Sequence, residues 1–347
     1  MKLKNLILKI VFCGCILSTV LALSCSQKTK IDEINPSCLI GSSSAIGVYD
    51  NFYSVSFVNP QKGWAVGYYG LIAYTEDGGK TWSRQESNTN DPLFSVKFVD
   101  EKNGWIVGKF GRILNTTDGG KTYITQSTNG VKEDLFDVFF VDRENGWSVG
   151  TFGTILHTSN GGKSWEKQGE ETDKIYNAVF FVDKDHGWIV GEYATILRTK
   201  DGGVNWEKLN PPIEEGVSLF DVCFSDKNTG IAVGMDGVIL LTKDGGDNWE
   251  VCNSPVNSHL FGISIIGNKG WACGLNGSYI YSNDLKNWNM PSQEFELKFW
   301  LSDIHFFDEK YGWMVGAHGI IRRTVDGGKT WIERGTDVCT RIYPKNA

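Results

Sequence analysis

The sequence has few of the residues and patterns that point to an enzyme or a nucleic-acid binder. Its 347 residues include 5 His, and 34 Lys or Arg stand against 41 Asp or Glu, which gives a formal charge of −7. It contains no G-x-S-x-G, H-E-x-x-H or paired C-x-x-C motif. A protein that binds the phosphate backbone normally carries a basic stripe. These absences argue against the common hydrolases, clustered zinc sites and a nucleic-acid partner.

Long apolar runs are lacking except near the start of the chain. Lys2, Lys4 and Lys9 precede an apolar stretch of residues 10–23, which is followed by Ser24 and Cys25. The stretch falls short of the roughly 20 residues of a comfortable membrane span, so it predicts a secretory signal. It resembles a bacterial lipoprotein signal in which Cys25 would carry the lipid; cleavage to a soluble form and retention as an anchor are the alternatives. Removing the three lysines would leave a net charge of about −10 on the mature chain.

Two short motifs recur instead along almost the whole chain. The first begins as TEDGGKTW and has six clear copies, ending at Trp82, Tyr123, Trp165, Trp206, Trp249 and Trp331, with a worn copy, SNDLKNW, ending at Trp288. The second is a Gly-Trp pair whose glycines are Gly63, Gly104, Gly146, Gly187, Gly230, Gly270 and Gly312, although Ile231 replaces the tryptophan after Gly230. Twelve of the 13 Trp lie in these two motifs, so the repeat has to be interpreted first as architecture.

Each repeat of about forty residues contains four short apolar or β-branched segments separated by turn residues. In the third repeat these are LFDVFFVD, GWSVGTF, TILHTS and WEKQGEE. Four strands per repeat of this length are typical of a β-propeller blade, and such densities of Gly and Trp argue against a helical solenoid. The sequence predicts an all-β fold, a seven-bladed β-propeller of four-stranded antiparallel blades. We expect residues 1–24 to form the signal peptide, 25–49 the anchor linker and lead-in, and 50–347 the propeller.

The first motif is interpreted as a hairpin staple. Asp77 can accept hydrogen bonds from backbone N–H groups of its turn, the paired glycines can adopt φ > 0, and Trp82 can pack beneath them. A calcium site would need several oxygen ligands from one loop, but Glu76 is replaced by Thr, Ser, Lys, Asn or Val in the other copies. We therefore predict neither a metal nor a cofactor.

These repeats resemble the BNR or Asp-box repeats, and the complete unit is similar to the photosystem II stability and assembly factor family of seven-bladed propellers. The resemblance implies a non-catalytic protein that assists the assembly of a complex, and an arginine-rich surface for partner contact. Arg112, Arg198, Arg322 and Arg323 partly match that surface; solvated edge charges are the alternative. Since one fold hosts many functions, the fold transfers more readily than the activity.

The turns between the second and third strands should share one face with the linkers between blades, where binding residues tend to collect. Four of these turns carry an aromatic residue at the same position and others carry polar residues. Together with a tryptophan on the last linker, the candidate partner-binding residues here are Tyr69, Phe110, Phe152, Tyr193, Asp236, His318 and Trp300. Such an arc could stack on a sugar or clasp a peptide, unless the rings merely cover their own turns.

The main alternative is a glycoside hydrolase or glycan-binding protein, since Asp boxes also occur in sialidases and xyloglucan-degrading enzymes. The nearest candidate carboxylates, Asp137, Asp221 and Asp303, recur at one position of the first strand, which favours capping of backbone N–H groups in the adjacent blade. We expect no catalytic residue. The leading hypothesis is an extracytoplasmic lipoprotein, at the outer membrane, periplasm or cell surface, that binds a protein or a glycan, touches the membrane through its lipid and binds no nucleic acid.

Five cysteines follow Cys25. Cys273 replaces the valine of the G-W-x-V-G pattern, so we expect it to be a buried small hydrophobe, and Cys223 and Cys252 have no predicted role. Cys38 and Cys339 flank the repeats and could form a disulfide in an oxidising compartment, although the sequence does not define the connectivity.

Overall fold

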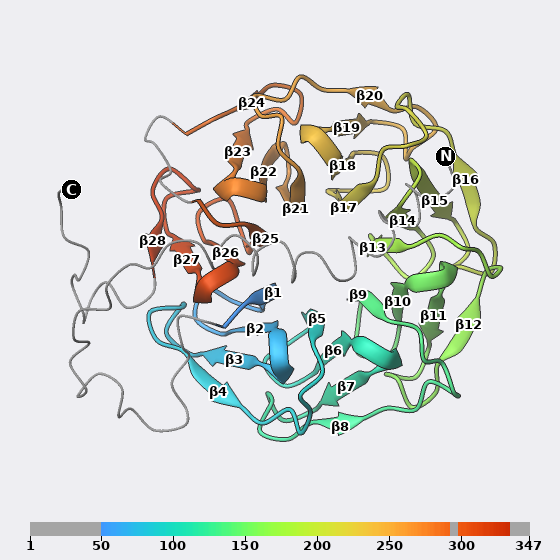
Figure 1. The fold of residues 1–347 in the computed structure, drawn as a ribbon, viewed down its shortest axis with the longest axis vertical. Helices are drawn as coiled ribbons and strands as arrows, with labels where there is room; N and C mark the ends of the chain where they lie inside the picture. Colours follow the sequence, from blue (N-terminus) through green and yellow to red (C-terminus); the bar gives the residue numbers. More distant parts are fainter. Residues whose placement is uncertain (1–49, 292–297, 334–347) are drawn as a thin grey trace, which may run out of the picture. The chain divides into compact units, whose positions relative to one another are not determined.

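The computed structural model describes residues 50–291 and 298–333, and the strands in these ranges form seven four-stranded antiparallel sheets arranged as a ring (Figure 1). Each sheet comes from one repeat, and its strands lie in chain order from the centre of the ring to the rim. The predicted all-β, seven-bladed propeller is confirmed. Within the described ranges, no helix is long and apolar enough to cross a membrane.

The strand bounds follow the repeats closely. Blades 1 to 4 consist of β1 (Phe52–Phe57), β2 (Gly63–Gly67), β3 (Ile72–Thr75), β4 (Ser83–Gln85); β5 (Leu93–Phe98), β6 (Gly104–Gly108), β7 (Ile113–Thr116), β8 (Ile124–Thr125); β9 (Leu135–Phe140), β10 (Gly146–Gly150), β11 (Ile155–Thr158), β12 (Glu166–Gln168); and β13 (Tyr176–Phe181), β14 (Gly187–Gly191), β15 (Thr195–Thr199), β16 (Glu207–Leu209). Blades 5 to 7 consist of β17 (Leu219–Phe224), β18 (Gly230–Gly234), β19 (Ile239–Thr242), β20 (Glu250–Val251); β21 (Leu260–Ile266), β22 (Lys269–Gly274), β23 (Tyr279–Ser282), β24 (Trp288–Asn289); and β25 (Leu301–Phe306), β26 (Gly312–Gly316), β27 (Ile321–Thr324), β28 (Ile332–Glu333).

The innermost strand of blade 3 is buried mainly on one side. In β9, Leu135, Val138 and Phe140 are buried between neighbouring blades, whereas Phe136 and Asp137 are partly exposed towards the centre of the ring. The pairing of β9 with β10 shifts register near Gly150, as at a β-bulge. This irregularity explains why two consecutive side chains of the strand face away from the core.

The tryptophan of the Gly-Trp pair connects each blade to the next. Trp147 stacks on Phe181 of the following blade, with ring centroids 3.5 Å apart, and its Nε1 donates a hydrogen bond to the Gly202 carbonyl at 3.0 Å. Trp313 makes the same two contacts across the ring closure, with Phe57 at 3.5 Å and the Gly78 carbonyl at 2.8 Å. The recurrence of this contact accounts for the regular spacing of both motifs, because the acceptor glycine belongs to the box of the next blade.

The interface between blades 5 and 6 departs from this pattern, and the residues that differ from the repeat lie on both sides of it. Ile231 replaces the tryptophan of blade 5, while Ile265 replaces the phenylalanine that it would stack on in blade 6. Leu285 stands in the worn box of blade 6, and all three side chains belong to one buried cluster. Aliphatic packing therefore takes the place of the ring stack and the tryptophan hydrogen bond at this interface.

The staple interpretation of the box is confirmed. Asp77 accepts hydrogen bonds from the Thr81 N–H at 2.9 Å and from the Thr75 and Thr81 hydroxyls at 2.8 and 2.6 Å. Both following glycines have positive φ, and the Trp82 Nε1 donates to the Gly79 carbonyl at 3.2 Å. Burial tends to raise the pKa of Asp77, but these hydrogen bonds to its carboxylate outweigh it and lower the pKa.

Candidate functional site

The propeller has two chemically different faces. One carries the boxes and the turns between the first and second strands, and we call it the box face; the other carries the turns between the second and third strands together with the linkers between blades, and we call it the turn face. In six blades the turn that defines the turn face is a single short element: η2 (Tyr68–Gly70), η3 (Lys109–Gly111), η4 (Thr151–Gly153), η5 (Met235–Gly237), η6 (Leu275–Gly277) and η7 (Ala317–Gly319).

The second residue of this turn has a left-handed backbone in all seven blades. The φ angles are 58° for Tyr69, 61° for Phe110, 55° for Phe152, 57° for Tyr193, 52° for Asp236, 57° for Asn276 and 55° for His318. The next residue also has positive φ, which makes each a type I′ hairpin turn. Asn, Asp and Gly suit this position, whereas a bulky residue there is a real outlier that costs roughly 1–2 kcal/mol. This strain was not predicted from the sequence, although the residue pairs Phe-Gly, Asp-Gly and Asn-Gly were a signal for it.

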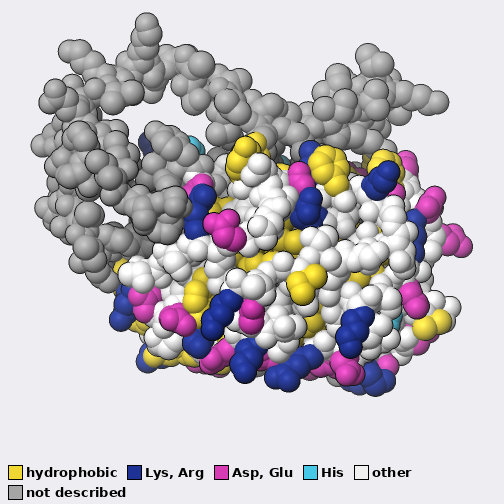
Figure 2. Space-filling view, turned by 90° about the horizontal axis from the view of Figure 1, so that it is seen from below, with side chains coloured by type: hydrophobic (Ala, Val, Ile, Leu, Met, Phe, Trp, Pro, Cys, Tyr) yellow, Lys and Arg dark blue, Asp and Glu magenta, His cyan; other side chains and the backbone are white. Residues whose placement is uncertain are grey.

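Three of the four aromatic rings in these turns are largely in solvent. The exposed fractions are 64% for Tyr69, 60% for Phe110 and 63% for Phe152, while Tyr193 is half-buried. Figure 2 views the propeller edge-on and shows hydrophobic side chains projecting at the rim of one face among charged ones. The alternative that these rings only cover their own turns does not hold for the three exposed rings, because most of their surface meets solvent.

Residues just before the next blade hold several of these turns in place. The Phe110 N–H donates to Asp134 Oδ1 at 2.9 Å, and the Asp236 N–H donates to His259 Nδ1 at 3.0 Å. These bonds satisfy backbone donors that a type I′ turn leaves free. These bonds therefore anchor the backbone of the turns to the linkers that precede the next blades.

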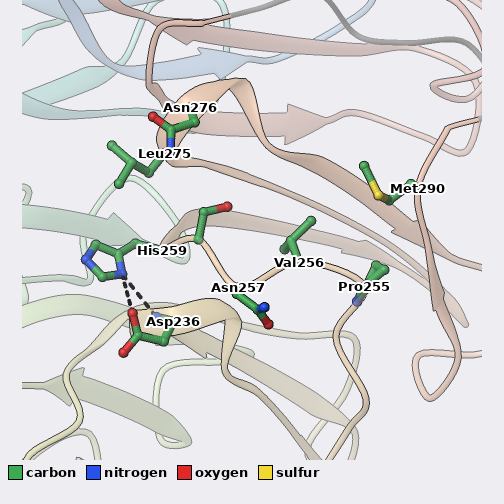
Figure 3. A pocket seen from close by; sticks show the side chains of 9 residues that line it. Asp236, Pro255, Val256, Asn257, His259, Leu275, Asn276 and Met290 are labelled. Carbon is green, nitrogen blue, oxygen red and sulfur yellow. Dashed lines mark hydrogen bonds and ion pairs between the residues drawn. The ribbon is translucent and has the colours of Figure 1, made fainter.

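A first hollow on this face lies between blades 5 and 6 (Figure 3). Its volume is about 520 Å³, and apolar side chains from the linker, from η6 and from the segment after β24 dominate it: Pro255, Val256, Leu275 and Met290. Asp236 and His259 approach one another at one side, with the carboxylate 3.4 Å from His259 Nδ1. Since Met290 is 57% exposed, this hollow offers adaptable apolar surface to a ligand.

A second hollow lies on blade 3, between the two linkers that flank this blade, and has a different character. Its volume is about 380 Å³, and it is lined by Glu133, Phe152, Lys167, Glu171, Thr172 and Asp173. Three of the six lining residues are acidic and one is basic. These carboxylates were not predicted as site residues, although the linker segments KED and EETDK that carry them are visibly rich in charge.

The carboxylates at the centre of the ring are structural, as the capping interpretation predicted. Asp137 accepts a hydrogen bond from the Val179 N–H at 2.9 Å, and Asp221 accepts one from the Ile263 N–H at 2.8 Å. Burial raises the pKa of Asp221, and the nearby charges of Asp303 and Asp137 raise it further. Each carboxylate thus links its own blade to the next one.

Aromatic residues of the innermost strands surround the centre of the ring on the side of the turn face. Phe94 and Phe136 lie 5.3 Å apart and Phe220 and Phe261 lie 5.4 Å apart, measured between ring centroids. Trp300, a predicted contact residue, is half-buried and stacks in parallel on Tyr53 with centroids 6.0 Å apart. Trp300 therefore packs against Tyr53 of the same chain and still exposes part of its surface.

The predicted arginines do not form one surface. Arg198 is 4% exposed; it donates to the Gly245 carbonyl at 3.0 Å and pairs with Glu207 and Asp247 beside a box. This burial corrects the expectation that Arg198 meets a partner. Arg112 pairs with Asp91 at 2.7 Å, and Arg322 pairs with Glu333 at 3.3 Å. The cationic groups of all three are therefore matched by carboxylates of the chain itself.

Some predicted positions lie outside the described residues. These are Cys25, the candidate lipid site, and Cys38 and Cys339, the candidate disulfide. Cys273 is fully buried, which confirms its expected role as a small core residue, and burial raises the pKa of its thiol. In the described part of the chain, no group of His, Cys, Asp and Glu is arranged to hold a metal ion.

Known proteins share this architecture. A YCF48 structure described as bound to a D1 peptide aligns with a TM-score of 0.69 at 23% identity, over 81% of this chain and 95% of that one. YCF48 from Cyanidioschyzon merolae gives 0.68 at 19% identity, over 81% and 97%. An ancestral GH74 enzyme gives 0.67 at 11% identity, over 83% of this chain and 46% of that one. At these identities the likeness shows the fold alone.

Sequence comparisons are more specific. A photosystem II assembly lipoprotein, Ycf48 of Prochlorococcus marinus, is 50% identical over 36 residues, which are 10% of this chain and 11% of that protein. The family model described as photosynthesis system II assembly factor YCF48 matches residues 41–128, 125–211, 206–292 and 280–343. Since these matches cover all seven blades, the chain belongs to the YCF48 family of photosystem II assembly factors.

Proposed function

We propose that this chain is a non-catalytic scaffold that holds a segment of another protein on its turn face and so helps to assemble or stabilise a complex at a membrane or cell surface. The observation that carries the proposal is the set of exposed aromatic rings on left-handed turns, above all Phe110 and Phe152. Asp236 and Asn276 make the same turn with residues that suit it. The fold does not need the aromatic residues, and strain that the fold does not need is a reason to infer binding.

The family supports a protein partner over a glycan. Its members are described as assembly factors, and one YCF48 structure is described as bound to a D1 peptide. A peptide segment laid across several turns would bury aromatic surface from neighbouring blades at once. For this chain, the corresponding arc runs from Tyr69 through Phe110 and Phe152 to Tyr193.

The chemistry at the centre of the ring favours binding over glycoside hydrolysis. The carboxylates that would have to act as acid and base are Asp137, Asp221 and Asp303, and each accepts a backbone hydrogen bond from the next blade. A catalytic pair needs at least one carboxyl group aimed at the substrate. Here the same side chains hold the blades together.

The proposal places the propeller outside the cytoplasm on a lipid anchor. The support is the signal-like segment before Cys25 and the description of the Prochlorococcus relative as a lipoprotein. A lipidated Cys25, followed by a lead-in of residues 25–49, would keep the propeller near partners in or on the membrane.

Site-specific photocrosslinking in the native membrane tests this function. A photoreactive phenylalanine analogue replaces Tyr193 on the turn face, and in a matched variant it replaces Val204, which is 76% exposed on the box face. We expect Tyr193 to yield one dominant protein adduct, identified by mass spectrometry, and Val204 to yield none of that protein. Equal adducts from both faces, or adducts with glycan only, would contradict the proposal.

A further inference from the structure

We propose that the hollow on blade 3, between its two flanking linkers, binds a lysine or arginine side chain of the partner polypeptide, with its cationic group against the Phe152 ring and facing the carboxylates of Glu133, Glu171 and Asp173. The inference rests on the proposed function and adds the chemistry of the segment that is recognised. Three features of the molecule support it: the difference between the turns of blades 2 and 3, the charges around the hollow, and the size of the hollow.

Blade 2 shows the interaction within the chain itself. The Lys109 Nζ lies 4.9 Å from the centroid of the neighbouring Phe110 ring, a distance typical of a cation–π contact. Phe152 has the same left-handed position in blade 3 and nearly the same exposure. The residue that corresponds to Lys109 is Thr151, which carries no charge. The Phe152 ring therefore presents the same surface without a cation from its own turn.

The charges around the Phe152 ring favour a cation from outside. Among the lining residues, Lys167 pairs with Glu171 at 2.7 Å, and the Glu171 side chain remains 82% exposed. On the adjoining linkers Glu170, Glu214 and Glu215 are exposed, and the described part of the chain gives them no ion pair. Three carboxylates against one lysine line the hollow, so a positively charged side chain entering here meets an excess of negative charge.

An anionic partner is disfavoured on the same face. Arg112, the predicted arginine at the start of a third strand, is already matched by Asp91 at 2.7 Å, and Arg198 is buried beside a box. A carboxylate-rich segment would have to displace Asp91 and approach the acidic linkers of blades 3 to 5. Charge complementarity therefore selects a basic segment for this chain.

The size of the hollow fits one long side chain. A volume of about 380 Å³ is near the lower limit of small-ligand pockets and is ample for one lysine or arginine side chain. The methylene groups of Lys or Arg can lie along the Phe152 ring while the charged end stays among the carboxylates in water. Further apolar residues of the same segment would then meet Tyr193 and Phe110 on either side.

The probes are three capped synthetic peptides of identical sequence except at a few positions, which carry Lys, norleucine or Glu. Binding to the full chain in detergent is measured by fluorescence anisotropy at low and at moderate salt. We expect the Lys peptide to bind at least about tenfold more tightly than the other two, with an affinity that falls as salt rises. Equal binding of the norleucine peptide would overturn the proposal, because the apolar stem alone would then be recognised.

Paired variants locate the binding. Phe152→Leu should weaken binding of the Lys peptide about threefold by removing the π face, and Glu133→Gln with Glu171→Gln should weaken it about fivefold. The controls lie on the box face: Phe307→Leu, which changes an exposed ring, and Glu101→Gln with Glu309→Gln, where both carboxylates pair with lysines. Losses in the control pair as large as in the test pair would mean a general charge effect and would overturn the proposal.

The result separates this inference from the proposed function. A specific crosslink at Tyr193 combined with no charge selectivity in the peptide assay would leave the scaffold function and remove the cation site. Selective binding of the Lys peptide that depends on Phe152, with no crosslink on the turn face, would support the cation site and count against the scaffold function. Binding of phosphatidylcholine vesicles in place of the Lys peptide, with the same dependence on Phe152, would overturn the inference in favour of a lipid headgroup.

Discussion

Asp303 Oδ2 accepts a hydrogen bond of 2.8 Å from the N–H of Val55, 248 residues earlier in the chain. This bond joins the innermost strand of the last blade, β25, to that of the first blade, β1. The stacking of Trp313 on Phe57 lies at the same interface. Because each blade is built from one continuous repeat, the strands within residues 50–291 and 298–333 close the ring without an exchange between blades. Closure depends on the same side-chain contacts that join the other blades.

Because Asp303 lies at the ring closure, its titration should make the free energy of unfolding depend on pH. Burial raises the pKa of Asp303 to about 6, the bonds from Val55 and Ser54 oppose that rise, and the charge of Asp137 adds to it. In the unfolded chain the pKa should be about 3.9. The folded state then holds the proton more tightly, so ionisation of Asp303 lowers the free energy of unfolding as the pH rises from about 4 to about 6.

Asp303→Asn removes this titration. We expect the free energy of unfolding of the variant, minus that of the wild type, to increase by about 1–3 kcal/mol between pH 4 and pH 7. Urea unfolding at several pH values measures the difference, in which the titrations of the box carboxylates cancel. A difference that stays constant over this range would show that Asp303 has an ordinary pKa.

The boxes should act on stability and leave binding unchanged. Asp77→Ala and Asp326→Ala each remove an acceptor from three hydrogen bonds within the turn. We expect each to lower the free energy of unfolding by about 1–3 kcal/mol in urea, with partner affinity near wild type while the protein is folded. Lys80→Ala, which changes an exposed residue of the same box, is the control and should have little effect. Loss of binding in a folded Asp77 variant would contradict the staple role.

Aromatic residues on the left-handed turns should reduce stability. Phe110→Asn and Phe152→Asn replace strained residues by one that suits a type I′ turn, and the rings that they remove are mostly exposed. We expect each to raise the free energy of unfolding by about 0.5–1 kcal/mol, while partner binding weakens. The reverse change, Asn276→Phe, should lower stability by a similar amount. Destabilised Asn variants would mean that the rings contribute to packing.

The lipid anchor can be tested by fractionation. If Cys25 carries lipid, Cys25→Ala should move the protein from the membrane to the soluble extracytoplasmic fraction, because the acyl chains supply the apolar surface that holds it there. Cys252→Ala, which removes a buried thiol of the propeller, serves as the control and should remain in the membrane. A Cys25→Ala protein that stays in the membrane would remove the lipoprotein assignment.

The architecture was predictable because it depends on local periodicity. The Gly-Trp column, the boxes and the alternation within each strand specify four strands per repeat and seven repeats, and the capping by Asp137 and Asp221 followed from their regular recurrence. The left-handed conformation of the turns was harder to predict from the sequence. The pair Phe152-Gly153 suggests a turn but does not give its handedness, which depends on closure of a two-residue hairpin.

The candidate site depended on contacts between repeats, which a single sequence does not reveal. Arg198 was expected at the surface, but its partners Glu207 and Asp247 lie on different segments and enclose it. The replacement at Ile231 and the worn box that contains Leu285 lie in successive repeats, and the sequence does not show that they meet at one interface. Likewise, Glu133 and Asp173 come from two successive linkers that only ring geometry brings to the same hollow.

The most direct test of the turn face as the working surface is a binding titration of the crosslinked partner, once purified, against the wild type and a triple variant, Phe110→Ala, Phe152→Ala and Tyr193→Ala. A matched variant, Val204→Ala with Val325→Ala, removes exposed apolar side chains from the box face. We predict that the triple variant binds at least tenfold more weakly, or about 1.4 kcal/mol, with little change in melting temperature, and that the matched variant binds like the wild type. A folded triple variant with full affinity would contradict the assignment of the working surface to the turn face.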